Sequence, residues 1–315
     1  MVSPNPIAQF LTQRPLMLLD GALATELERR GADLHDVLWS AKVLMEQPNL
    51  IRAVHRDYFE AGADVAISAS YQANFEAFAC HGIDTIRAAQ FLRDSISLAA
   101  QARDDFWAEP GNRIGRALPL IAASIGPYGA MLADGSEYRG HYDLSDDELM
   151  AFHRPRLEVL AQCGADVLAC ETIPSLREAL VLARLLAEFP SASAWISFAC
   201  ADGAYTCEGQ RIAECVSRLN DFPQVVSVGV NCTRPEYITS LLQSMRDHTD
   251  KPLLVYPNSG EHYDARTRQW AGLVDSSPFA QQARGWYEQG ARLIGGCCRT
   301  RPSDIRAIRA WAALL

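Results

Sequence analysis

Short apolar runs alternate along the chain with longer amphipathic segments. Eight runs are filled with Val, Ile, Leu and Ala without a clean alternation, as is typical of strands buried on both faces of a parallel sheet. They are LMLLDGA (16–22), ADVAISAS (63–70), PLIAASIGP (119–127), ADVLACET (165–172), AWISFAC (194–200), VVSVGVNC (225–232), PLLVYPNS (252–259) and ARLIGGCC (291–298). The intervening segments, such as 50–63, 145–165 and 174–189, carry apolar residues every three or four positions, which predicts helices.

Three of the predicted helices end in the related phrases EAGADV, AQCGADV and EQGARL. Gly62, Gly164 and Gly290 stand where a left-handed C-cap would turn the chain into the next strand. Eight such strand-helix units predict an α/β fold, a (β/α)8 TIM barrel that forms one domain over residues 1–315. The alternative is a doubly wound open sheet, but DGALATELERRG lacks the G-x-G-x-x-G spacing of a nucleotide turn.

Composition and charge indicate which kinds of molecule the protein binds. The 315 residues are 49% hydrophobic and 21% charged, which is typical of a well-buried globular protein. A net charge of −9 without a basic run argues against nucleic acid and anionic membranes, and favours a small-molecule partner. The sequence shows neither a signal peptide nor an apolar stretch of about 18 residues, so we expect a cytoplasmic protein.

The chain has nine cysteines, an odd number. In a reducing compartment they are better interpreted as buried small residues plus a metal or catalytic set than as a disulfide framework. Cys80, Cys163 and Cys215 lie in helix-like stretches, where we expect simple interior packing. Cys297 and Cys298 differ from these because they are adjacent and follow two glycines at the end of the last apolar run.

In a barrel of this kind, chemistry collects at the C-terminal ends of the strands. The residues at these ends are Asp20, Gly21, Ser70, Tyr71, Gln72, Gly126, Glu171, Thr172, Asn231, Cys232, Asn258, Cys297 and Cys298. Barrel closure brings the sixth and eighth strands within one strand of each other, so Cys232 can reach the adjacent pair of cysteines.

Three thiolates from two strand ends predict a zinc (Zn²⁺) site with one open position, which is the mark of a catalytic rather than a structural zinc. Two alternatives stay open at this point. The three cysteines could be unrelated buried residues, or the site could be a closed one whose fourth ligand is Cys200, Cys207 or His262.

Several phrases resemble the homocysteine-binding barrel shared by betaine-homocysteine methyltransferase and the homocysteine module of cobalamin-dependent methionine synthase. They are DGALATELERRG, SASYQA, ADVLACETIPS, GVNC, YPNSGEHYDA and LIGGCCRT, and they closely resemble the short, stand-alone S-methylmethionine:homocysteine S-methyltransferases over nearly the whole chain. The resemblance implies methyl transfer from S-methylmethionine, or S-adenosylmethionine, to the thiolate of L-homocysteine, which forms methionine. It also implies that the cysteines at 232, 297 and 298 bind zinc, with the homocysteine sulfur in the fourth position, and that Asp20 and Glu171 lie at the amino-acid end of the substrate.

The residues themselves fit such a substrate. Asp20 and Glu171 can pair with an α-ammonium, and the backbone N–H groups of Ala24 and Thr25 can receive a carboxylate at the start of a helix. An Asp-Gly turn and a salt bridge are the alternatives for the two acids. Further predicted substrate contacts are Gly21, Ser70, Tyr71, Gln72, Asn231 and Asn258, with a plain loop hydrogen bond as the alternative for each asparagine.

Residues 126–148, GPYGAMLADGSEYRGHYDLSDDE, exceed the usual length of a βα loop and are rich in tyrosines and acids. This lid segment is predicted to cover a cationic methyl donor, with Tyr128, Glu137, Tyr138 and Tyr142 as candidate contacts. A solvated acidic loop is the alternative. No flavin, nicotinamide or cobalamin segment is recognisable, so we expect direct transfer from a sulfonium. A betaine-dependent enzyme and a non-catalytic zinc-binding barrel are the alternative functions.

Overall fold

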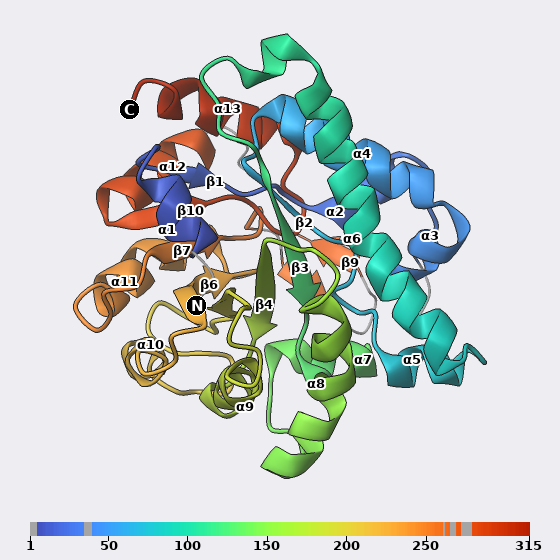
Figure 1. Ribbon diagram of the computed structural model, residues 1–315. Coiled ribbons are helices and arrows are strands. Elements are labelled where there is room, and N and C mark those ends of the chain that lie inside the picture. The colour runs from blue at the N-terminus through green and yellow to red at the C-terminus, as the bar shows by residue number, and fades with distance from the viewer. Residues whose placement is uncertain (1–4, 35–39, 261, 265–268, 272–278) are drawn as a thin grey trace.

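The computed structural model describes residues 5–34, 40–260, 262–264, 269–271 and 279–315 (Figure 1). Its centre consists of parallel strands: β1 (Met17–Leu18), β2 (Val65–Ile67), β3 (Leu120–Ile125), β4 (Val167–Ile173), β5 (Ala194–Phe198), β6 (Val225–Asn231), β7 (Leu253–Tyr256) and β10 (Ala291–Ile294). These eight strands form one sheet in the order β1-β10-β7-β6-β5-β4-β3-β2. A parallel bridge between Leu19 and Val65 joins the first strand to the second and closes the sheet into a barrel.

Helices surround the strands (Figure 1). They are α1 (Pro6–Leu11), α2 (Leu23–Arg29), α3 (Ser40–Glu46), α4 (Pro48–Ala61), α5 (Phe75–Cys80), α6 (Thr85–Ala108), α7 (Tyr128–Leu132), α8 (Asp146–Leu160), α9 (Leu176–Leu186), α10 (Ile212–Arg218), α11 (Pro235–Met245), α12 (Phe279–Glu288) and α13 (Pro302–Ala312). The 3-10 helices η1 (Pro110–Arg113) and η2 (Ser136–Tyr138), and a hairpin of β8 (His262–Asp264) with β9 (Gln269–Ala271), complete the description. Within the described ranges, none of the helices has both the length and the apolar character needed to cross a bilayer.

The predicted (β/α)8 TIM barrel is confirmed. Each of the eight apolar runs contains one barrel strand, and the doubly wound alternative is wrong because the sheet closes on itself. The C-cap prediction also holds, since Gly62, Gly164 and Gly290 have φ values of 114°, 83° and 110°. These left-handed conformations are ones that glycine adopts without the steric cost of a Cβ.

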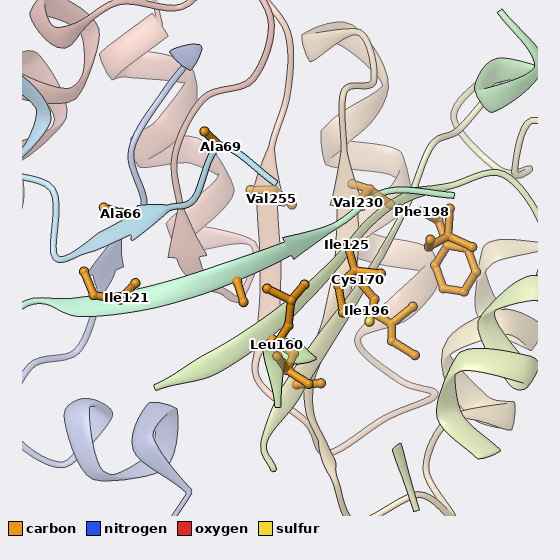
Figure 2. Packing of buried hydrophobic residues seen from close by; sticks show 14 of the residues in the cluster. Ala66, Ala69, Ile121, Ile125, Leu160, Cys170, Ile196, Phe198, Val230 and Val255 are labelled. Carbon is orange, nitrogen blue, oxygen red and sulfur yellow. The ribbon is translucent and has the colours of Figure 1, made fainter. Parts of the chain in front are cut away.

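Two apolar layers explain why the strands show no alternation. One layer fills the barrel interior with strand residues such as Leu19, Trp195 and Leu254. The other lies between the sheet and the helices, and Figure 2 shows part of it, with Ile125 and Cys170 of neighbouring strands near Leu160 of α8. Because both faces of each strand are buried, apolar residues are favoured at successive positions.

The nine cysteines are all free thiols. Cys215 in α10 is buried, as expected from its helix-like stretch, and Cys163 is half-buried in the turn that follows α8. Cys80 is exposed, so the expectation of interior packing is wrong there. The reason is its position as the last residue of the short helix α5, directly before a surface turn.

Candidate active site

A cavity of about 230 Å³ lies at the C-terminal ends of the barrel strands. Its wall combines residues at or directly after the ends of β1, β2, β4, β6, β7 and β10 with part of the lid segment. Of the predicted site residues, it includes Asp20, Gly21, Ala24, Thr25, Tyr71, Gln72, Glu171, Asn231, Cys232, Cys297 and Cys298. The cavity therefore collects nearly all of the chemistry predicted from strand ends.

The cysteine cluster consists of Cys232, Cys297 and Cys298, whose sulfur atoms all lie within 4.8 Å of one another. The sulfur of Cys298 is 3.5 Å from that of Cys232 and 4.0 Å from that of Cys297. Three sulfurs at about 2.3 Å from a tetrahedral zinc would stand about 3.8 Å apart, which is close to the two separations of 3.5 and 4.0 Å. The cluster can hold one metal ion and leaves room for a fourth ligand on the cavity side.

Backbone contacts bring these three sulfurs together. The N–H of Cys232 donates to the carbonyl of Tyr256 (3.1 Å), and the N–H of Cys297 donates to the carbonyl of Pro257 (2.7 Å). The glycines before the cysteine pair are needed because a Cβ on Gly296 would collide with the Thr300 side chain. The sequence GGCC thus reflects close packing at the end of β10 as well as the thiols themselves.

The three thiols of the cysteine cluster shift one another's pKa values. The pKa of Cys232 lies well below its usual value because the thiols of Cys297 and Cys298 hydrogen-bond to its sulfur, helped by the Tyr138 hydroxyl at 3.1 Å. The same contacts raise the pKa of Cys297 and of Cys298. Cys232 therefore carries the first thiolate of the group, which prepares the cluster for a cation.

The two acids in the cavity are buried and come from different strands of the barrel. Asp20 follows β1, and its carboxylate accepts a hydrogen bond from the N–H of Ile67 (2.8 Å). Glu171 lies in β4 and accepts hydrogen bonds from the hydroxyls of Ser124 and Tyr256. Burial raises the pKa of Asp20, with a further contribution from the negative charge of Glu171, and burial raises the pKa of Glu171 to about 7. Two such carboxyl groups favour a bound cation that would relieve their desolvation.

Asn231, at the end of β6, binds the end of β4 across the barrel mouth rather than only facing the cavity. Its Oδ1 accepts from the N–H of Thr172 (2.7 Å), and its Nδ2 donates to the Thr172 hydroxyl (2.8 Å). Thr172 and Cys232 both have left-handed φ values, 61° and 45°, which non-glycine residues adopt at a free-energy cost. Asn231 therefore stabilises the sharp turn of the chain directly after Glu171.

Two predicted substrate contacts lie outside the cavity lining. The Ser70 hydroxyl donates to the carbonyl of Ser124 (2.8 Å), and Oδ1 of Asn258 accepts from the N–H of Gly260 (2.9 Å). The Ser70 side chain thus ties the chain after β2 to β3, and the Asn258 side chain holds its own loop, which was the stated alternative for this residue. At the start of α2, Ala24 and Thr25 line the cavity, and the Thr25 hydroxyl accepts from the N–H of Arg299 (3.2 Å).

The four lid candidates divide into two pairs. Glu137 and Tyr138, both in η2, line the cavity. Tyr128 and Tyr142 are not part of its lining, because their rings pack edge to face with centroids 5.2 Å apart. Burial raises the pKa of Glu137 to about 7. The lid therefore presents one acid and one phenol to the cavity, and the other two tyrosines stabilise its own fold.

A fully buried group anchors the beginning of the lid segment. Nε2 of His153 donates to Glu178 (2.8 Å), and its Nδ1 accepts from Arg156 (2.9 Å), which fixes a neutral imidazole. Burial lowers the pKa of His153, consistent with this neutral form. Glu178 also accepts from the N–H of Tyr128 (2.6 Å), and Arg156 donates to the carbonyl of Gly126 (2.7 Å). The first residues of the lid are thus held by α8 and α9 together.

Sequence reasoning missed Tyr256 and gave no role to Thr172. Tyr256 is the last residue of β7. Its hydroxyl oxygen accepts a hydrogen bond from the indole N–H of Trp195 (3.1 Å) and lies within hydrogen-bond distance of the Ser197 hydroxyl (2.7 Å). Its position at a strand end was the available signal. The closed-site alternative gains no support, since neither Cys200 nor Cys207 joins the one cluster found among described residues. The His262 side chain lies outside what the structure describes.

The profile of the homocysteine S-methyltransferase family matches residues 17–312. The chain is also 55% identical over 311 residues to homocysteine S-methyltransferase YbgG of Bacillus subtilis, an alignment that covers 99% of each chain. The chain belongs to the homocysteine S-methyltransferase family. A second member, from Escherichia coli, is 49% identical over 317 residues, with 98% of this chain and 99% of that one covered.

The crystal structure of the homocysteine methyltransferase MmuM from Escherichia coli, in its metallated form, has the same fold. Its TM-score to this chain is 0.88 at 46% identity, and the alignment covers 98% of this chain and 100% of that one. Methyl transfer to homocysteine is thus the activity of this homocysteine S-methyltransferase, and the non-catalytic alternative is set aside.

Proposed function

We propose that this homocysteine S-methyltransferase uses zinc and takes its methyl group from S-methylmethionine, with S-adenosylmethionine as a slower donor. The observation that carries the proposal is the cysteine cluster, whose sulfur spacing of 3.5 and 4.0 Å suits tetrahedral zinc, at the wall of a cavity with two buried acids. The metallated form of MmuM is a relative in which a metal is present. Small molecules are the proposed partners, in a cytoplasmic, single-domain protein.

The cysteines at 232, 297 and 298 are the proposed zinc ligands. Zinc held there would lower the pKa of the homocysteine thiol, which is otherwise about 8.5, and so supply a thiolate at neutral pH. Three anionic sulfur ligands suit this task because they leave electron density on the substrate sulfur. The low pKa of Cys232 means that one of these ligands is ready without loss of a proton.

The remaining homocysteine contacts are proposed for residues on the first and fourth strands. Glu171 and Asp20 would bind the α-ammonium, which satisfies two carboxyl groups that burial otherwise destabilises in their charged forms. The N–H groups of Ala24 and Thr25 would receive the carboxylate. Gly21 permits the close approach in this region, since a Cβ there would lie 2.8 Å from the Thr300 hydroxyl.

The donor is proposed to lie under the lid segment, in the part of the cavity beside Tyr138 and the cysteine cluster. Attack of a thiolate on a sulfonium neutralises both charges, so a site from which water is excluded favours the transition state over the separated ions. Tyr138 and Tyr71 supply aromatic surface for the sulfonium, which has no N–H or O–H to donate.

Competition between donors tests this proposal. Zinc-loaded protein receives S-methylmethionine, S-adenosylmethionine and betaine at equal concentration, each with a distinguishable methyl label, together with homocysteine. We expect label in methionine mainly from S-methylmethionine. Label mainly from betaine would move the chain to the betaine-dependent branch, and equal activity after complete removal of zinc would contradict the role of the metal.

A further inference from the structure

Two side-chain oxygen atoms of residues that line the cavity are buried and lack a hydrogen-bond partner in the part of the chain that the structure describes. They are Oε1 of Gln72 and Oε2 of Glu137. A buried acceptor without a donor pays the whole desolvation free energy of that atom, and native proteins rarely keep one without a reason. The pair therefore calls for a ligand that carries hydrogen-bond donors.

Both atoms belong to the lid side of the cavity. Nε2 of Gln72 donates to the carbonyl of Ala130 in α7 (3.1 Å), which fixes the amide so that Oε1 is the free acceptor. Glu137 precedes Tyr138, whose hydroxyl lies 3.1 Å from the Cys232 sulfur. Glu137 also packs against Gly129, the residue before Ala130, since a Cβ on Gly129 would collide with the Glu137 backbone nitrogen. Both residues therefore contact α7 on the lid side of the cavity wall.

The acids proposed to bind homocysteine differ from Glu137 because they already accept hydrogen bonds from the protein. Asp20 accepts from the Ile67 N–H, and both oxygens of Glu171 accept from hydroxyl groups. Protein donors thus partly satisfy those carboxylates before a substrate arrives, whereas one oxygen of Glu137 has none among the described residues. The cavity has two distinct acceptor groups, one on the barrel and one at the lid.

The chemistry of the lid group selects its ligand. An amide oxygen and a carboxylate oxygen only accept, and the carboxylate adds a negative charge, so the best partner is a primary ammonium. A sulfonium or a quaternary ammonium has no N–H to give. In S-methylmethionine the ammonium nitrogen lies four bonds from the sulfonium sulfur, about 5 Å when extended. A donor whose methyl faces the cysteine cluster would then carry its ammonium to a neighbouring part of the wall.

We propose that Gln72 and Glu137 bind the α-ammonium of the methyl donor, so that the enzyme selects amino-acid sulfonium compounds over sulfonium or quaternary ammonium compounds that lack this group. This inference rests on the proposed function. It adds a second amino-acid binding group to the cavity, separate from the one proposed for homocysteine.

The test uses Glu137→Gln, which keeps the shape and removes the charge. We expect kcat/KM for S-methylmethionine to fall about ten- to a hundred-fold, as for loss of a charge-assisted hydrogen bond, with the KM for homocysteine unchanged. The inhibition constant of 4-(dimethylsulfonio)butanoate, which lacks only the ammonium, should change less than about twofold. Gln72→Leu should lower kcat/KM for S-methylmethionine by about two- to tenfold, as for a neutral hydrogen bond.

Asp134→Asn is the matched control, because it removes the same charge from an exposed lid residue that pairs with Arg139 outside the cavity lining. It should leave all three constants within about twofold. An equal effect of Glu137→Gln on S-methylmethionine and on the butanoate, no effect on either, or a raised KM for homocysteine would each overturn the inference. A wild-type enzyme that draws no methyl from S-methylmethionine would refute the proposed donor itself, which is a separate result.

Discussion

The hydroxyl of Tyr256 donates a hydrogen bond to Glu171 across 3.0 Å inside the barrel mouth. Tyr256 is the last residue of β7, Glu171 lies in β4 with two strands between them in the sheet, and both residues are buried. Because a charge-assisted hydrogen bond stabilises the carboxylate form, Tyr256 keeps Glu171 closer to ionisation than burial alone would allow. This contact makes Tyr256 a positioning residue for the proposed ammonium site.

Tyr256→Phe should raise the KM for homocysteine about tenfold and leave zinc content unchanged, because the Glu171 carboxylate loses one of its two hydroxyl donors. Steady-state kinetics and metal analysis check this. Tyr287→Phe in α12, on the outer face of the barrel, is the control. A wild-type KM for homocysteine in the Tyr256→Phe variant would contradict the positioning role of Tyr256.

Glu171→Gln should weaken homocysteine binding about ten- to a hundred-fold, since it keeps the shape of the side chain but removes the charge that pairs with the ammonium. Zinc content should again be unchanged. Calorimetric titration measures the affinity directly, and an unaltered value would return Glu171 to a structural role.

The pKa of Glu171, raised to about 7 by burial, also predicts a pH dependence. The ammonium pairs with the ionised carboxylate, so the affinity for homocysteine should be full above pH 7 and fall as the pH decreases through that value. Binding measured between pH 5.5 and 8.5 checks this, and Glu171→Gln should flatten the acidic limb. If the affinity of the Glu171→Gln variant still falls at acidic pH, another group is responsible for the pH dependence.

Cys298→Ser should remove most bound zinc and abolish methyl transfer while the fold largely survives, because the apolar layers of the barrel are untouched. Metal analysis, activity and circular dichroism test this together. Cys80→Ser, which changes an exposed thiol outside the cluster, should behave as wild type. Full activity in a zinc-free Cys298→Ser protein would refute a catalytic metal.

His55 in α4 predicts a change in stability with pH. Its side chain is buried, neither ring nitrogen has a partner among the described residues, and burial lowers its pKa to about 4. A depressed pKa means that the unfolded chain takes up the proton first, so up to about 3 kcal/mol of stability should be lost as the pH falls from 6.5 towards 4. Urea unfolding of His55→Leu should show a weaker loss over this range, and an unchanged slope would contradict the assignment.

The barrel could be predicted from sequence because its signals are local. Each buried strand is a short apolar run, and each glycine C-cap lies at the end of its own helix, as Gly62 does. The strand ends then located Cys232 and the adjacent cysteines, since closure of a barrel determines which ends are neighbours.

Contacts between side chains that are far apart in the sequence leave no local pattern from which they could be predicted. Tyr256 and Glu171 are 85 positions apart, and His153 lies 25 positions from Glu178, so no spacing or periodicity relates the partners. For Asn258, a polar residue after a strand looked like a substrate contact, but its side chain stabilises its own loop. A strand end therefore identifies candidates, and only the packing of neighbouring strands decides which of them reach the cavity.

The cysteine cluster joins the end of β6 to the end of β10, with β7 between them in the sheet. A metal bound there would act as a cross-link that closes the chain from Cys232 to Cys297 into a loop, and it would stabilise the folded form because the unfolded chain lacks the assembled site. Because this loop contains β7 and α11, the concentration of free metal would set how firmly the last third of the barrel is held. Limited proteolysis of the metal-depleted protein would then begin in that region, and the ion would be a folding ligand as well as a reagent.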